Sequence, residues 1–263
     1  SYNANMATNE VFIDSATLRE NVVALARNIG YVPRSRKAAT ATVSFFVDAT
    51  NISPPPATIT LKKGPVAVSA GTFANSAYVF SIPEDITVAV GDGIAVFDEI
   101  SIYEGTLLTS NFTFSSRVPN QKFILPNVGV DTELLSVSVK ANQQSTTGTK
   151  YSKQDSLFAV GSESKVYFLQ EVKDEQYELI FGDGVFGKAL EDGNYIEVDY
   201  IASNGDSANG VKSFSFAGRL TYTRNGTDYT VTSGISLLDV SSSATGGQAI
   251  ESVASVKNYA PRI

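Results

Sequence analysis

The clearest hydrophobic pattern in the sequence is helical and lies near its beginning. Within residues 14–29, "DSATLRENVVALARNI", apolar side chains recur at steps of three and four: Leu18, Val22, Leu25 and Ile29. This spacing predicts a helix, with Asp14 or Ser15 as its N-cap and Gly30 at its end. The apolar stripe needs a surface to pack against. We expect the chain's own β-core to supply it, and another subunit is the alternative.

From Ala41 onward the pattern changes to short runs of β-branched and aromatic residues, separated by Gly, Pro, Asn and Asp. Such runs predict strands. The predicted strands are 41–47, 58–62, 78–82, 94–103, 107–115, 134–140, 165–172, 176–181, 195–201, 212–217, 219–223, 228–232 and 235–240. The polar stretch 142–156, punctuated by glycine, is expected to be an exposed connection between β-units.

A second helical pattern lies near the end of the sequence and predicts a helix over 248–258, where Ile250 and Val253 repeat at helical spacing and Pro261 terminates. The predicted fold is therefore mainly β with flanking α-helices, with two β-rich domains (sandwich or mixed-sheet) and an N-terminal and a C-terminal helix. The predicted division is an N-terminal helical segment, a first β-rich domain that includes the C-terminal helix, and a second β-rich domain. Their ranges are 1–37, then 38–134 with 216–263, then 135–215.

Composition excludes many kinds of chemistry. The 263 residues include no cysteine and no histidine, so disulfides, thiol nucleophiles, the usual zinc ligand sets and imidazole bases are excluded. The net charge of -7 repels phosphate backbones and anionic lipid. Residues 1–40 carry five basic and three acidic residues, a charge of +2, which leaves -9 for the rest. We expect no cofactor, no small-molecule substrate, no nucleic acid and no membrane partner.

The apolar runs are too short to cross a bilayer, and the amino end has no charged-then-apolar leader. The sequence begins at Ser1 and ends directly after a predicted helix. We therefore expect a fragment of a longer chain.

The stretch "FGDGVFGKALEDGNY", residues 181–195, matches the G-x-x-x-x-G-K part of a phosphate-binding loop and then fails, because Ala189 stands where Ser or Thr would bind magnesium. A phosphate loop must also enter a helix, whereas "YIEVDYIA" alternates as a strand does. We therefore predict a wide β-hairpin. Its glycines supply positive φ or close backbone approach, and Asp183 bonds to nearby amides.

The acidic residues of this stretch raise two other functions, calcium binding and glycoside cleavage. A calcium loop is disfavoured because the spacing of an EF-hand is absent around Asp183, Glu191, Asp192 and Asn194. A pair of carboxylates for glycoside cleavage has no motif to anchor it. A carboxylate-based hydrolase and a carbohydrate- or receptor-binding β-domain stay open as alternative functions, although the lack of tryptophan disfavours a sugar platform.

Three segments resemble the baseplate J-like family of baseplate wedge proteins from contractile-tailed, T-even-like bacteriophages. The most specific is "YELIFGDGVFGKALEDGNYIEVDYIASNGDSANG", residues 177–210, with its F-G-D-G-x-x-G and N-G elements. Residues 244–262 resemble the family's G-G-x-x-x-E-S helix ending in A-P-R, and residues 12–43 resemble the opening helix and strand.

The resemblance implies a structural component of the virion, in the tail baseplate, assembled in the host cytoplasm. It implies assembly of a ring around the tail hub, with other wedge subunits and copies of the protein itself as partners, and no catalysis. Family members usually continue past A-P-R into a dimerisation region, which this sequence does not contain.

Two sets of residues are the candidate sites. The structural motif comprises Phe181, Gly182, Asp183, Gly184, Gly187, Lys188, Gly193 and Asn194. The candidate partner-binding residues are Arg19, Arg27, Arg34, Arg36 and Lys37, of which the last three form a basic knot whose simpler interpretation is a solvated connection. No catalytic and no metal-binding residue is predicted.

Overall fold

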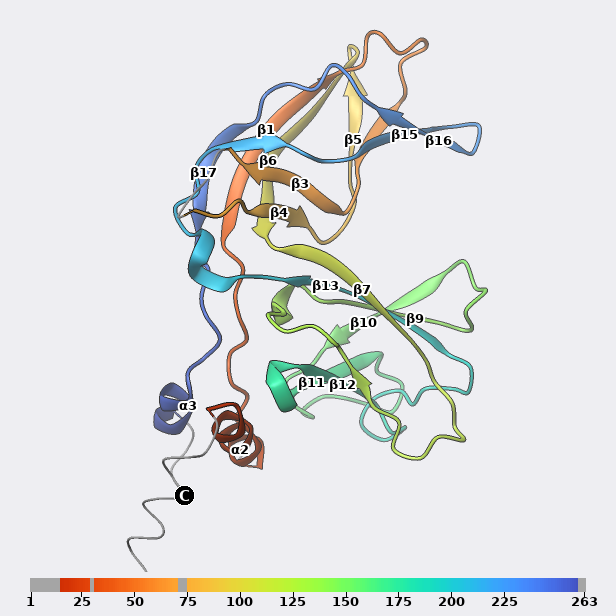
Figure 1. Cartoon of the computed structure of the whole chain (residues 1–263). Helices are drawn as coiled ribbons and strands as arrows, with labels where there is room; N and C mark the ends of the chain where they lie inside the picture. The colour runs from red at the N-terminus through yellow and green to blue at the C-terminus, as the bar shows by residue number, and fades with distance from the viewer. Residues whose placement is uncertain (1–14, 29–30, 71–74, 260–263) are drawn as a thin grey trace, which may run out of the picture.

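The computed structural model describes residues 15–28, 31–70 and 75–259. Two β-sheets carry a helix at each end of the described chain, which confirms the predicted class, mainly β with flanking helices. The helices are α2 (Ser15–Asn28) and α3 (Val253–Tyr259), and they lie side by side next to the smaller sheet (Figure 1). Single 3-10 turns are η1 (Thr132–Leu134), η2 (Lys173–Glu175) and η3 (Gly205–Ala208).

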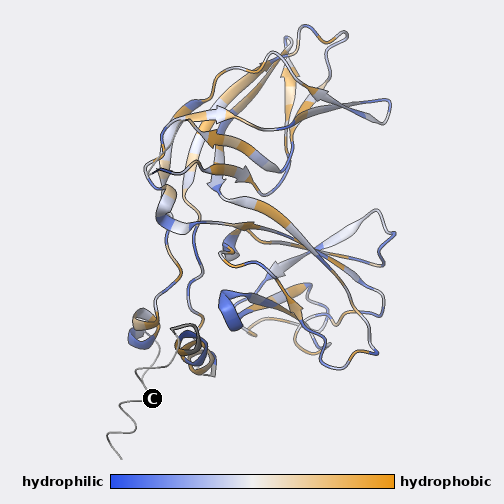
Figure 2. Ribbon diagram, in the orientation of Figure 1, coloured by the Kyte–Doolittle hydropathy of each residue, from blue (hydrophilic) through white to orange (hydrophobic). Residues whose placement is uncertain are grey.

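The larger sheet has ten strands and holds the larger core. Its strands are β1 (Thr40–Asp48), β2 (Thr58–Leu61), β3 (Gly64–Ser69), β4 (Val79–Ile82), β5 (Ile86–Gly91), β6 (Ile94–Glu104), β14 (Phe214–Phe216), β15 (Leu220–Arg224), β16 (Thr227–Val231) and β17 (Asp239–Thr245). Alternate residues of β1 point into the core, where Phe45 stacks on Phe97 with ring centroids 4.8 Å apart. Figure 2 shows the hydrophobic residues concentrated on these strands. Two-residue periodicity in the sequence therefore becomes one buried face.

The smaller sheet has seven strands in the order β7-β13-β9-β10-β11-β12-β8. They are β7 (Thr106–Thr113), β8 (Phe123–Ile124), β9 (Ser136–Lys140), β10 (Gly148–Lys153), β11 (Val166–Glu171), β12 (Tyr177–Phe181) and β13 (Tyr195–Ala202). β10 and β11 run parallel, and the other neighbouring pairs are antiparallel, so the sheet is mixed.

A buried carboxylate, that of Glu104, lies where the chain leaves the larger sheet and where it returns from the smaller one. Glu104, at the end of β6, is 1% exposed and accepts hydrogen bonds from the Ser203 hydroxyl and from the amide and side chain of Asn204. Gly205 has φ +69, and a Cβ there would lie 2.9 Å from the Gln248 carbonyl oxygen. The N-G element quoted above is therefore where the return from the smaller sheet packs against the segment leading to α3.

The sequence predicts most elements, and the structure corrects several details. Every predicted strand overlaps an observed one, and the helix predicted over 14–29 is observed as α2, with Asp14, Ile29 and Gly30 outside the described residues. The helix predicted over 248–258 begins only at Val253, because Gln248 pairs with Lys37 in an antiparallel bridge. Pro261 lies outside the described residues. Strands β3, β5 and β8 were not predicted.

The prediction that 142–156 is only an exposed connection is wrong. Within it, β10 pairs with β9 and β11 and buries the Tyr151 side chain, which is 9% exposed. A single inward aromatic among polar residues gives little periodic signal, which is why the strand was missed.

The predicted β-hairpin of the Gly-rich stretch is also wrong. Strand β12 pairs with β11 and β8, whereas β13 pairs with β7 and β9, so the two strands flanking the stretch are not neighbours. The stretch is a crossover between separated strands. The strand pattern on either side of the stretch suggested a hairpin, but the eight residue pairs between β13 and β7 fix β13 elsewhere in the sheet.

The division into domains stays a prediction. Sheet membership differs from it at β7 and β8, which lie inside the range 38–134 but hydrogen-bond within the smaller sheet, and at β14, which begins inside the range 135–215 but pairs with β3 in the larger sheet. We therefore propose Gly105, the residue between β6 and β7, as the boundary between the two β-rich units. Gly105 has φ +138 and packs against the Ala202 carbonyl group.

Candidate partner-binding surface

The predicted residues occupy two separate places. The Gly-rich connection, residues 181–194, joins β12 to β13 in the smaller sheet, and the basic candidates lie on α2 and on the segment that links it to β1. The structure does not bring the two sets together into one site.

The Gly-rich connection is closed by glycine-on-glycine contact. A Cβ on Gly182 would collide with the backbone of Gly187, and Gly184 and Gly187 have φ of +89 and +94. Gly193, farther along, has φ +86. The glycines thus lie at positive φ or in close backbone contact, as predicted, and L side chains are strained at such φ values.

Hydrogen bonds fix the loop. The Asp183 carboxylate accepts from the amides of Phe186 (2.8 Å) and Val185 (2.9 Å), and these bonds hold the pKa of Asp183 below its usual range. The Gly187 amide donates to the Gly161 carbonyl at 3.0 Å and the Lys188 amide to the Ser164 carbonyl at 2.8 Å. The connection is thus tied to the loop before β11.

The ends of the connection are also structural. The Phe181 ring packs edge-on against Phe123 and Tyr151, and the Asn194 side chain accepts from the Glu191 amide at 2.9 Å. The Lys188 ammonium lies 4.0 Å from Glu163. No helix follows the connection, so the helix N-terminus on which a phosphate-binding loop depends is not formed here.

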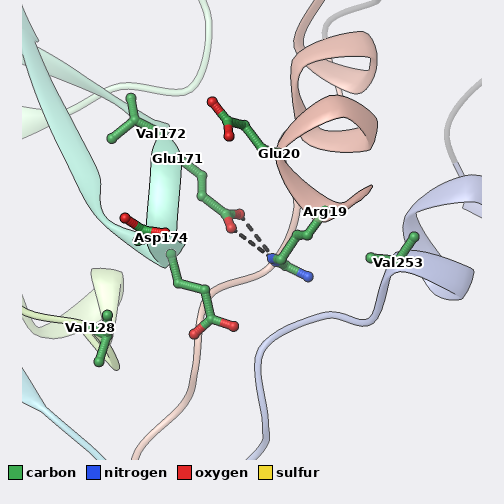
Figure 3. Close-up of a pocket in the computed structure, with 8 residues that line it drawn as sticks. Arg19, Glu20, Val128, Glu171, Val172, Asp174 and Val253 are labelled. Atoms are coloured by element: carbon green, nitrogen blue, oxygen red, sulfur yellow. Dashed lines mark hydrogen bonds and ion pairs between the residues drawn. The ribbon is translucent and has the colours of Figure 1, made fainter. Parts of the chain in front are cut away.

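Arg19 anchors α2 to the smaller sheet. Its Nε lies 2.8 Å from Glu171 Oε1 and its second nitrogen 3.1 Å from Oε2, a bidentate pair in which the Glu171 side chain is 3% exposed (Figure 3). Arg19 also donates to the Glu251 carbonyl group. The prediction that Arg19 is exposed for a partner is therefore wrong. Arg19 is buried where it pairs with Glu171, which lies 152 residues away in the sequence.

Glu251 holds the linking segment to α3. Its carboxylate accepts from the Tyr31 hydroxyl (2.7 Å), the Arg34 amide (2.8 Å) and the Ser255 hydroxyl (2.8 Å). Burial alone would raise the pKa of Glu251. The hydrogen bonds from these three donors have the larger combined effect, so the pKa lies below its usual range. This is the glutamate of the G-G-x-x-x-E-S element, and its role is to join two segments far apart in sequence.

The other basic candidates differ in how freely they are exposed. Arg27 donates to the Gln170 side chain at 3.2 Å, and Arg36 donates to the Ser203 carbonyl at 3.0 Å and lies 3.7 Å from Glu175. Arg34 and Lys37 are exposed; the Arg34 side chain contacts Gln248. The basic knot is thus partly a structural clamp, at Arg36, and partly a solvent-facing surface, at Arg34 and Lys37.

Two residues of the predicted apolar stripe of α2 are exposed, Leu18 at 38% and Leu25 at 66%. The buried positions of the helix are instead Arg19, Val23 and Ala26. The expectation that the stripe packs on the β-core is wrong at these two residues. The pair between Arg19 and Glu171 turns a different side of the helix inward.

A pocket of about 430 Å³ lies beside this anchor, between α2, α3 and η2. Figure 3 shows the Glu20 and Asp174 side chains around it, with Val128 and Val253 completing its walls. Among the residues that the structure describes, no group of three or more acidic side chains is placed to hold a metal ion. None of the described helices is long and apolar enough to span a membrane.

No family model matches the chain. Over 235 residues it is 27% identical to the baseplate wedge protein gp6 of Enterobacteria phage T4, an alignment that covers 82% of this chain and 34% of that protein. The chain is therefore similar to a baseplate wedge protein over most of its own length. The chain spans about a third of the length of the curated relative that it matches.

Sequence reasoning missed the two carboxylates that hold α2 and the linking segment in place, Glu171 and Glu251. Glu251 was visible as part of a quoted element, although its partners were not. Nothing in the local sequence around Glu171 marks it, because its role depends on contact with α2.

Proposed function

We propose that the chain is a structural part of a baseplate wedge and acts through protein–protein interfaces in assembling the ring around the tail hub. Its partners would be other wedge subunits and copies of the protein itself. The similarity to a baseplate wedge protein supports this proposal at the level of the class of protein.

The observation that supports an interface at the helical end is the orientation of α2. The helix is held by a buried bidentate ion pair, and yet it presents Leu18 and Leu25 to solvent. Apolar side chains on a firmly held helix favour burial by a partner. Arg34 and Lys37 lie exposed on the following segment and add positive charge to an otherwise acidic chain. We therefore assign the partner-binding surface to Leu18, Leu25, Arg34 and Lys37.

The proposal assigns the chain no substrate, cofactor, nucleic acid or membrane and no catalytic step. The loop carboxylates support this, since Asp183 and Asp192 are both bound to backbone amides and have lowered pKa values, unlike a general acid. The site of action would be the tail baseplate of the virion, after assembly in the host cytoplasm.

The test uses the phage-encoded protein that contains this chain, co-expressed with the other wedge subunits. We expect Leu18→Ser with Leu25→Ser, and separately Arg34→Glu with Lys37→Glu, to reduce co-purification with those subunits while circular dichroism stays that of the wild type. Val118→Ser is the matched control, because Val118 is 50% exposed in the turn after β7. Undiminished co-purification of both double variants would refute this assignment of the interface.

A further inference from the structure

A cluster of apolar side chains lies on the outer face of the larger sheet. Phe46 of β1 is 49% exposed, its cross-strand partner Val96 of β6 is 55% exposed, and Leu237, just before β17, is 93% exposed. The Ser236 hydroxyl accepts from the Phe46 amide at 2.9 Å, and the Ser236 amide donates to the Phe46 carbonyl at 2.9 Å, so Leu237 is held beside Phe46. Together they line a shallow depression of about 800 Å³.

The local backbone explains why these side chains point outward. In β1 the inward positions are Phe45 and Val47, so Phe46 between them must face away from the core. The pairing of Phe46 with Val96 lies within a run of consecutive pairs from Phe45 to Asp48, so the register is fixed on both sides. Adjacent exposed apolar side chains on firmly paired strands mark an interaction surface more often than isolated ones do.

Carboxylates lie on the same strands as the apolar cluster and face the same side. Asp239 lines the depression, and a β-bulge in β6, with Glu99 at φ +48, turns Asp98 and Glu99 both to the outside. Asp48 ends β1 on the same side. Strands β1, β6 and β17 contain no lysine and no arginine, so nothing in these strands balances the negative charge.

The charge decides what can dock here. Two copies of the chain that met through this face would bring like carboxylate rims together, and nucleic acid or anionic lipid would be repelled in the same way. A partner that buries the apolar centre gains only if its own rim is basic. The face therefore favours a partner that is apolar at its centre and basic at its edge.

We propose that this face docks a segment of another protein that presents two or more apolar side chains flanked by lysine or arginine. The apolar side chains cover Phe46, Val96 and Leu237, and the basic groups pair with Asp98 and Asp239. The face lies on the larger sheet, away from the helical surface assigned above, so the two proposals can fail separately.

The probe is a short synthetic peptide of alternating leucine and lysine, titrated into the purified chain by calorimetry. We expect saturable binding that Val96→Ser with Leu237→Ser weakens by about tenfold or more, as removal of central apolar contacts does. Asp98→Asn with Asp239→Asn should also weaken it and reduce its dependence on salt. A peptide with glutamate in place of lysine should not bind.

Phe158→Ser is the matched control, because Phe158 is 88% exposed in the smaller sheet's unit. Equal affinity of the Phe158 variant and the Val96 and Leu237 variant, binding of the glutamate peptide, or no binding at all would overturn the proposal. So would self-association in sedimentation velocity that disappears in the Val96 and Leu237 variant, since the occupant would then be a second copy.

Discussion

Replacing Arg19 with methionine should detach α2 from the smaller sheet. The change keeps an unbranched, mainly apolar side chain but removes both hydrogen bonds to Glu171, whose side chain is only 3% exposed, and the bond to the Glu251 carbonyl group. Breaking a buried ion pair by removing one partner typically costs about 3–5 kcal/mol, because the remaining charge stays buried without a partner. Undocking the helix returns water to Glu171, so the cost should appear in α2.

The assay is hydrogen exchange followed by mass spectrometry. A loss of about 3 kcal/mol corresponds to roughly a hundredfold faster exchange of α2 amides, since each 1.4 kcal/mol is tenfold. Exchange in β1 and β6, which belong to the larger core, should stay unchanged. Arg27→Met is the matched control and should have an effect within about 0.5 kcal/mol, because Arg27 is exposed and makes a single side-chain bond at 3.2 Å.

A double variant separates charge from packing. Arg19→Met with Glu171→Met should recover most of the protection of α2, because an apolar pair of similar volume can replace a buried ion pair. Wild-type exchange of α2 in Arg19→Met, or a double variant as exposed as the single one, would refute the reasoning.

Three further predictions concern the Gly-rich connection and Glu251. Gly184→Val and Gly187→Val should each lower the free energy of unfolding by about 1–3 kcal/mol through strain at positive φ. Lys188→Ala should change it little, because the Lys188 ammonium lies 4.0 Å from Glu163 and the contact is exposed to solvent. Equal denaturant midpoints for all three variants would show that the glycines are dispensable. ATP with magnesium should not bind, since no helix N-terminus follows Lys188, and a saturable micromolar affinity lost in Lys188→Ala would contradict this. Because the pKa of Glu251 is lowered in the folded state, its carboxylate stabilises the protein at pH values above the unfolded pKa, and this stability is lost as pH falls through the folded pKa. The difference in melting temperature between wild type and Glu251→Gln should therefore shrink on acidification. A constant difference from pH 7 to about pH 3 would exclude this contribution.

The kinds of elements could be predicted from the sequence because they follow from local periodicity. The strand predicted over 134–140 is observed as β9, with alternating buried and half-buried positions, and the glycines of 182–187 lie at positive φ or in close contact. Strand order could not be predicted. It depends on contacts between segments far apart, such as β13 with β7, and the spacing of β12 and β13 suggested a hairpin that does not form.

The helical surface illustrates the same limit. Periodicity identified Leu18 and Leu25 as one face of α2 but could not tell whether that face is covered. The answer depends on Glu171, a residue that turns the helix about its axis by pairing with Arg19. Arg19 was consequently misassigned to the exposed surface, whereas Arg34 and Lys37 do lie on it.

The most direct test of the structural role is quantitative mass spectrometry of tails purified from the phage that encodes this chain. A wedge component predicts peptides from this chain in the baseplate fraction, in a fixed ratio to the other wedge subunits and retained after a high-salt wash. Peptides found only in the lysate of infected cells, with none in purified tails, would contradict the role.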